Sequence, residues 1–179
     1  MTSIKLDLRI KLIIRWLVAN TIAWLLGLLL AIILSHLVVN IFHPEETNLI
    51  VGLCLGFSLG FAQWLVLKRL MKIGILWFIV PAIGIGLPYA WFIMQLETGN
   101  DLPLILNTDG VFLAILFFIC GALVGFIQSR LKSMNLGKSY IWILLSGIAW
   151  SISLTTNSFL FSGLIFGLVT FAAFILILK

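Results

Sequence analysis

Long apolar runs dominate the chain and constrain its fold more than any other feature. A helix needs about 20 apolar residues to cross the roughly 30 Å of hydrocarbon in a bilayer. Six runs come close to that length or exceed it, over residues 16–40, 49–67, 73–96, 110–127, 140–154 and 158–178. With 63% hydrophobic and only 9% charged residues, the chain lacks the polar surface that a soluble globule of 179 residues requires. The sequence therefore predicts an all-α integral membrane protein with six transmembrane helices in a single domain, residues 1–179.

The last two runs leave an alternative open. The run 140–154 is short, and the turn that follows it, 155–158, carries no charge. A re-entrant pair that does not fully cross the membrane is therefore the alternative for residues 140–178. Full crossing is the favoured interpretation, because 39 residues are nearly enough for two short spans.

The charged residues orient the six spans. In a six-span arrangement every basic residue falls on one side: Lys5, Arg9, Lys11, Arg15, Lys68, Arg69, Lys72, Arg130, Lys132, Lys138 and Lys179. The other side carries only acids: Glu45, Glu46, Glu97, Asp101 and Asp109. Basic loops stay in the cytoplasm, so both termini are expected there. We expect the lipid bilayer as the main partner, with an anionic lipid or an acidic protein at the cytoplasmic face, and no nucleic acid.

Residues 1–11 form a basic juxtamembrane segment with an unusual pattern. Apolar residues alternate strictly with polar ones from Ile4 to Leu12. A period of two is typical of a strand, which could pair with the sheet edge of a partner. The favoured interpretation is a segment that lies on the anionic inner leaflet.

An internal repeat divides the chain into three helix hairpins, residues 12–69, 73–132 and 138–179. The second helix of each hairpin carries two glycines and a polar residue at i, i+4 and i+7, which share one helix face. These triplets are Gly56, Gly60 and Gln63; Gly121, Gly125 and Gln128; and Gly163, Gly167 and Thr170. Each first helix has a matching triplet: Trp16, Asn20 and Ala23; Trp77, Pro81 and Gly84; and Trp142, Ser146 and Ala149. Two spans per unit preserve orientation, so the three hairpins are expected to be parallel repeats about an axis along the membrane normal.

The first repeat carries a family resemblance. The blocks GFAQWLVLKR at 60–69 and WLVANTIAWLLG at 16–27 resemble a family of small six-span membrane proteins of cyanobacteria and other bacteria. In that family, Trp-led helices alternate with Gly-rich helices that end in a GxxxGxxQWLVLK-like signature. This chain departs from the pattern at Ser129–Arg130, at Thr170, and at the prolines Pro81 and Pro88. The resemblance implies three hairpins in a bacterial inner membrane, or in the thylakoid membrane of a cyanobacterium, and it implies no activity.

The repeated small and polar residues predict helix packing. Glycines allow close backbone approach in a bilayer, so we expect the three glycine-bearing helices to meet around a central axis. The polar side chains Asn20, Gln63, Gln128, Ser146 and Thr170 must find hydrogen bonds inside hydrocarbon. They either join helices, with Asn20 bonded to Gln63 across a hairpin, or line a polar cavity that faces the cytoplasm.

Two further features are structural predictions. Pro81, Gly84 and Pro88 form a candidate hinge in the third run, because proline removes a helix hydrogen bond. Aromatic residues near the cytoplasmic level are expected to form the inner aromatic belt: Trp16, Trp64, Trp77, Tyr140 and Trp142.

Residue patterns typical of catalysis are scarce. The GxSxG motif around Ser58 lies within a helical run and not on the strand-to-helix turn that exposes a nucleophile. His36 and His43 make a single i, i+7 pair, whereas zinc takes three or four ligands, and no carboxylate lies deep in a run. We therefore expect no catalytic residue, no metal site and no cofactor.

These observations predict a non-catalytic multi-pass membrane protein, a structural or accessory subunit of a larger membrane complex. The alternative is a component that binds or transports a small molecule, such as the substrate-capture subunit of a transporter. A pocket between the helices would favour the alternative, and a closed, packed bundle would argue against it.

Overall fold

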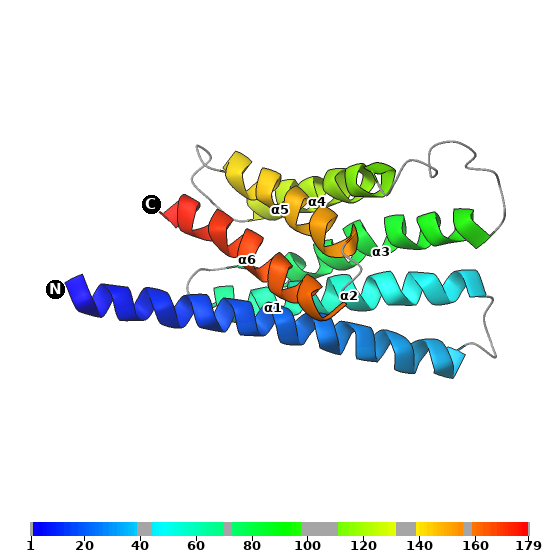
Figure 1. The fold of residues 1–179 in the computed structure, drawn as a ribbon, viewed down its shortest axis with the longest axis horizontal. Helices are drawn as coiled ribbons and strands as arrows, with labels where there is room; N and C mark the ends of the chain where they lie inside the picture. The colour runs from blue at the N-terminus through cyan, green and yellow to red at the C-terminus, as the bar shows by residue number, and fades with distance from the viewer. Residues whose placement is uncertain are drawn as a thin grey trace.

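The computed structural model describes residues 2–38, 44–69, 73–97, 111–131, 139–155 and 159–178, and these ranges are helical apart from short turns. The helices are α1 (Thr2–Val38), α2 (Pro44–Leu67), α3 (Leu76–Glu97), α4 (Val111–Leu131), α5 (Ser139–Thr155) and α6 (Phe159–Leu178) (Figure 1). Side chains are described within 10–37, 49–69, 73–88, 111–131, 139–155 and 161–176. The predicted all-helical class is confirmed.

Three of the helices are long and apolar enough to cross a membrane. The stretches that meet this criterion are Ile10–Leu37 of α1, Leu49–Leu67 of α2 and Val111–Leu131 of α4. The other apolar stretches are shorter among the described residues: Leu76–Pro88, Ser139–Thr155 and Phe161–Leu176. By length and composition, three of the described helices are thus candidate membrane spans.

The N-terminal segment is helical. α1 begins at Thr2 and continues without a break into the first apolar run, so the strand suggested by the alternation from Ile4 to Leu12 is wrong. Extending an existing helix adds one hydrogen bond for each residue that is fixed, whereas a lone strand gains nothing without a neighbouring strand.

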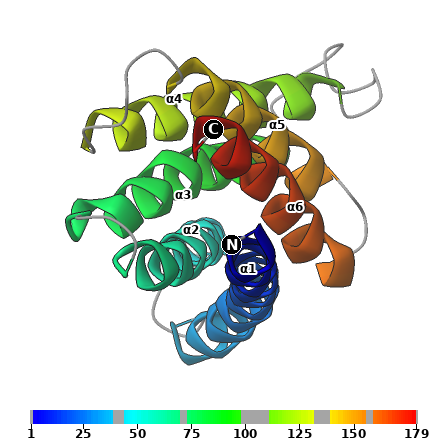
Figure 2. The ribbon, with the colours of Figure 1, turned by 90° about the vertical axis from the view of Figure 1, so that its left-hand side faces the viewer.

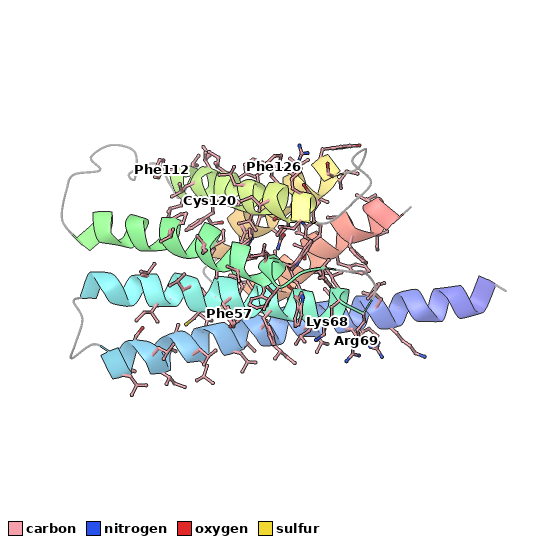
Figure 3. All side chains as sticks on the ribbon, turned by 180° about the vertical axis from the view of Figure 1, so that it is seen from behind. Phe57, Lys68, Arg69, Phe112, Cys120 and Phe126 are labelled. Atoms are coloured by element: carbon pink, nitrogen blue, oxygen red, sulfur yellow. The ribbon has the colours of Figure 1, made fainter. Side chains whose placement is uncertain are left out.

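The six helices form a closed ring. Each helix packs against its neighbours in the chain, and α6 packs against α1 to complete the circuit (Figure 2). Both chain ends lie at the same end of the bundle (Figure 1). Lys68 and Arg69 lie where α2 ends, beside α1 (Figure 3).

The glycine stripes hold successive repeats together. A Cβ atom added at Gly56 would collide with the Pro81 backbone oxygen and would lie 2.7 Å from the Cα of Ala82, both in α3. At Gly121 the added atom would lie 2.9 Å from the Ser146 backbone oxygen in α5, and at Gly163 it would lie 3.1 Å from the Thr21 Cα in α1. Each stripe therefore packs on the first helix of the next repeat, with α6 returning to α1.

This arrangement differs from the expected meeting of three glycine-bearing helices around an axis. The residue that precedes the second glycine of each stripe is large, namely Leu59, Val124 or Phe166, and all three line the cavity at the centre. Bulky side chains thus fill the axis. The close approach of helix backbones occurs on the neighbouring face of each glycine-bearing helix, where that helix contacts the first helix of the next repeat.

Gly56→Ala should lower the free energy of unfolding by about 2 kcal/mol, because the methyl group meets backbone atoms of α3 that cannot move without separating two helices. Gly74→Ala is the matched control, because a Cβ atom there meets nothing within 4 Å, and its effect should stay within about 0.5 kcal/mol. Thermal unfolding in detergent measures both. Equal melting temperatures for the two variants would contradict the close contact between α2 and α3.

Candidate functional site

Nine polar side chains are buried among the described residues, and all of them are uncharged. They are Asn20, Ser58, Gln63, Gln128, Ser129, Ser146, Ser153, Ser162 and Thr170. All five polar residues singled out in the repeats are in this group. Burial of a polar group in an apolar environment is costly without a hydrogen bond, so the partners of these five residues define what the site can do.

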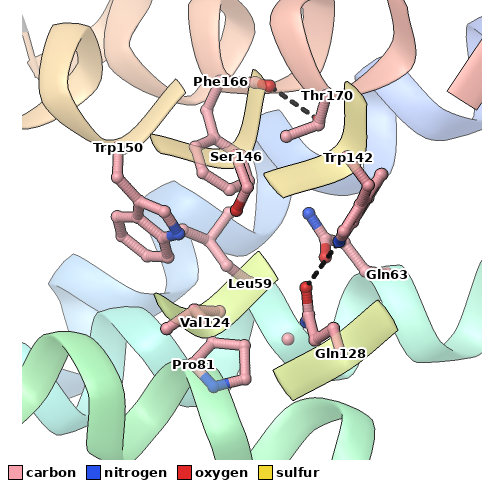
Figure 4. Close-up of a pocket in the computed structure, with 11 residues that line it drawn as sticks. Leu59, Gln63, Pro81, Val124, Gln128, Trp142, Ser146, Trp150, Phe166 and Thr170 are labelled. Atoms are coloured by element: carbon pink, nitrogen blue, oxygen red, sulfur yellow. Dashed lines mark hydrogen bonds between the residues drawn. The ribbon is translucent and has the colours of Figure 1, made fainter. Parts of the chain in front are cut away.

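Four of the five residues surround one central cavity. Gln63, Gln128 and Thr170 point toward it from α2, α4 and α6, and Ser146 lines it from α5 (Figure 4). Each of the first three lies one turn after the bulky residue that fills the axis, because 59 and 63, 124 and 128, and 166 and 170 are i, i+4 pairs. The second helices of the repeats therefore present the same face to the axis.

Tryptophan side chains bond to this polar layer across the junctions between repeats. The Nε1–H of Trp16 in α1 donates to the Thr170 Oγ1 in α6 at 3.1 Å. The Nε1–H of Trp142 in α5 donates to the Gln128 Oε1 in α4 at 3.2 Å. In both cases the tryptophan that leads one repeat bonds to the polar residue of the preceding repeat, next to the glycine stripe of the same junction.

The third junction breaks this symmetry. By analogy, Trp77 of α3 would donate to Gln63 of α2, but the buried Trp77 Nε1 has no hydrogen-bond partner. The Gln63 Nε2–H donates to the Asn20 Oδ1 at 3.3 Å, and the Asn20 Nδ2–H donates to the Trp16 backbone oxygen at 2.8 Å. The structure thus contains the Asn20–Gln63 bond expected across the first hairpin, and this bond draws the Gln63 amide toward α1.

Proline explains how the second repeat differs from the first. Pro81 occupies the position of Asn20, and it has no N–H to bond the Trp77 backbone oxygen four residues earlier. The Gln128 Nε2–H of α4 donates to that oxygen at 3.2 Å. α3 continues as a helix through both prolines, so Gln128 compensates for the bond lost at the first of the three hinge candidates.

The other hinge candidates lie in the same packed helix. At Gly84 an added Cβ atom would collide with the Val124 side chain of α4, so α3 approaches α4 closely at this position. Pro88 is half-buried. The hinge segment is therefore held against the neighbouring helix on at least one face.

The cavity itself is small. Its volume is ≈ 10 Å³, and a water molecule needs roughly 10–15 Å³ by the same measure. The cavity has room for about one water and for no larger ligand. The polar layer is therefore a set of contacts between helices in the described core.

Three of the five residues assigned to the inner aromatic belt lie in the core instead. Trp16, Trp77 and Trp142 are at most 1% exposed, and Trp77 packs against Trp142 with ring centroids 5.7 Å apart. Trp64 is half-buried and Tyr140 is exposed, as belt residues would be. The signal for burial was that the three tryptophans recur at the same spacing from the polar or small residues of each hairpin; Trp16 and Trp142 also donate hydrogen bonds there.

The described residues offer no set of groups suited to acid–base or metal chemistry. Their buried polar side chains are amides and hydroxyls, and they contain no group of three His, Cys, Asp or Glu side chains that could hold a metal ion. Ser58 is buried within α2, and His36 is exposed near the end of α1, while the side chains of His43, Glu45 and Glu46 lie outside the described set.

No family model, no curated protein and no solved structure matches this chain.

Replacing each junction tryptophan by phenylalanine should give unequal losses of stability. Trp16→Phe and Trp142→Phe each remove a hydrogen bond and leave a buried oxygen with one bond fewer, and each should cost about 1 kcal/mol more than Trp77→Phe. Trp77→Phe is the matched control, because it removes the same volume from an equally buried site whose N–H has no partner. Thermal unfolding in detergent measures the series, and three equal losses would contradict a role for these bonds.

Proposed function

We propose that this chain is a six-span, non-catalytic membrane protein that serves as a structural or accessory subunit of a larger membrane complex. The observation that carries the proposal is the contrast between its interior and its exterior. The polar groups of the repeats bond to one another around a cavity that holds about one water. Binding to other molecules is therefore left to the outer faces of the ring.

The outer face of α1 is the most extensive of these surfaces. Only 28% of the residues in an 18-residue apolar stretch of α1 are buried, and large side chains such as Ile22, Leu26 and Leu29 are half exposed. Each Å² of such surface in water costs about 25 cal/mol. Lipid tails or the helices of a partner subunit remove that cost.

The arrangement of the helices supports six crossings with cytoplasmic termini. The chain ends share one end of the bundle (Figure 1), and the start of α1 and the ends of α2 and α4 carry the described basic residues Lys11, Arg15, Lys68, Arg69 and Arg130. α5, with 17 residues, is about 26 Å long at 1.5 Å per residue. Local thinning of the bilayer accommodates a helix slightly shorter than the hydrocarbon core.

The interior also bears on the choice between the two candidate functions. Small-molecule sites usually enclose about 300–1,000 Å³, far more than the ≈ 10 Å³ at the centre of this ring. Catalysis by acid–base transfer needs titratable groups, whereas the buried polar side chains described are neutral. Both comparisons favour the accessory subunit over a component that captures its substrate inside the ring, and over an enzyme that uses acid–base groups there.

The topology is tested by cysteine labelling in a background that carries Cys54→Ala and Cys120→Ala. A membrane-impermeant maleimide added to intact cells should label Asn107→Cys and Asn157→Cys, and it should label Ser133→Cys only after the membrane is opened. Labelling at position 157 requires that the last hairpin crosses fully. Protection of position 157 together with labelling of position 107 would contradict six spans and favour the re-entrant pair.

The accessory role is tested by purifying the tagged chain from its native membrane in a mild detergent. We expect a complex well above 20.0 kDa that contains a second protein in fixed ratio and no water-soluble small molecule in fixed ratio. The same tag on an unrelated six-span protein is the control. A chain that purifies without a second protein would contradict the accessory role, and a water-soluble small molecule bound in fixed ratio would favour the substrate-capture alternative.

A further inference from the structure

A continuous groove runs along the outside of the ring between α1 and α2. Its first part, of ≈ 360 Å³, is lined by Leu12, Arg15, Val18, Ala19, Leu65, Val66 and Arg69. Its second part, of ≈ 440 Å³, shares Ala19, Leu65 and Val66 with the first and extends past Ile22 and Leu26 to Leu30. The groove is therefore charged at one end and apolar along the rest of its length.

Two arginines supply the charge. Arg15 and Arg69 come from different helices and are both exposed, and no carboxylate lies among the described side chains that could neutralise them. The nearest acid in the α1 sequence is Asp7, eight residues before Arg15, or about 12 Å along a helix. Two guanidinium groups at one end of a groove favour an anion, and arginine binds phosphate through paired hydrogen bonds.

The neighbouring lysine is held differently. The Lys68 Nζ lies 4.0 Å from the centroid of the Trp64 ring, which is a cation–π distance. Lys68 does not line the groove. Among the described side chains, Arg15 and Arg69 are therefore the two cations that line the groove.

The apolar part has the length and lining that a lipid chain requires. From Arg15 to Leu30 the groove extends 15 residues along α1, or about 22 Å, which is longer than the roughly 15 Å that one leaflet contributes to the hydrocarbon core. Phe57 and Phe61 form part of the wall, with their rings stacked at 6.1 Å. Small side chains at Ala19, Ala23 and Ala62 leave the space that a chain would fill.

We propose that this groove binds one anionic phospholipid, with its phosphate between Arg15 and Arg69 and an acyl chain along the α1–α2 seam. The inference rests on the proposed membrane topology, which places the arginines at the cytoplasmic leaflet, where anionic lipids attract basic groups. A lipid in this position covers exposed apolar side chains of the first hairpin. It also bridges α1 and α2 at the end where α2 turns toward α3.

The test is native mass spectrometry of the full-length protein in detergent, titrated with dioleoyl phosphatidylglycerol or with dioleoyl phosphatidylcholine. We expect one phosphatidylglycerol molecule to bind about tenfold more tightly than phosphatidylcholine. Of the two lipids, only phosphatidylglycerol has a headgroup with a net negative charge that the two arginines can attract. Arg15→Gln with Arg69→Gln should remove that preference. Lys68→Gln with Arg130→Gln removes the same charge outside the groove and should keep it.

A second arm tests the apolar part and the source of the anion. Ala19→Phe fills the groove without changing charge, and it should weaken binding of both lipids by about tenfold while the melting temperature reports that the fold is intact. Glycerol phosphate in excess should not displace the bound lipid. Equal binding of the two lipids by the wild-type protein, unchanged binding by the double arginine variant, or displacement by glycerol phosphate would each overturn the proposal.

This test is independent of the labelling and purification experiments above. Lipid binding in detergent is measured whether or not the chain crosses the membrane six times or joins a complex. Equal binding of the two lipids by the wild-type protein would therefore count against the groove alone, and protection of position 157 would count against the topology alone.

Discussion

Close approach of helix backbones at the junctions between repeats is the condition on which the other contacts depend. In a bilayer the solvent is as apolar as the side chains, so helices associate through packing and a few hydrogen bonds. The glycine stripes bring α2 against α3, α4 against α5 and α6 against α1. Only at this separation can the Trp16 and Trp142 rings reach Thr170 and Gln128, and only then is the central cavity reduced to the size of one water.

The three hairpins that the sequence pattern predicts to be repeats differ in their hydrogen bonding at one shared position. Asn20, Pro81 and Ser146 occupy equivalent places, but Asn20 attracts the Gln63 amide, whereas Pro81 frees a carbonyl that Gln128 must bond. Gln128 therefore serves two partners, the Trp77 oxygen and the Trp142 N–H, while Trp77 has none for its own N–H. The broken symmetry is a local result of proline chemistry and of one amide that prefers a nearer partner.

Much of this architecture can be predicted from the sequence by apolar length and residue spacing. These two patterns do not determine which helices pack against one another. Apolar length identifies the helices, and i, i+4, i+7 spacing places Gly56, Gly60 and Gln63 on one face. Spacing says nothing about which neighbour that face meets, and so the expected cluster of three glycine-bearing helices was wrong. The burial of Trp16, Trp77 and Trp142 depends on the ring closing around them, a long-range property that their place near the charged loops does not reveal.

Ring closure depends on contacts between the two ends of the chain, because α6 packs on α1. The partner of Trp16 is 154 residues later in the chain, which at 5–20 residues per second takes about 8–31 s to make. The Asn20–Gln63 bond between α1 and α2 joins residues only 43 apart in the chain, so both of its partners are made long before α6. The first hairpin can therefore form its own contacts before the ring has an interior, and α6, the last helix in the chain, is the one that closes the ring.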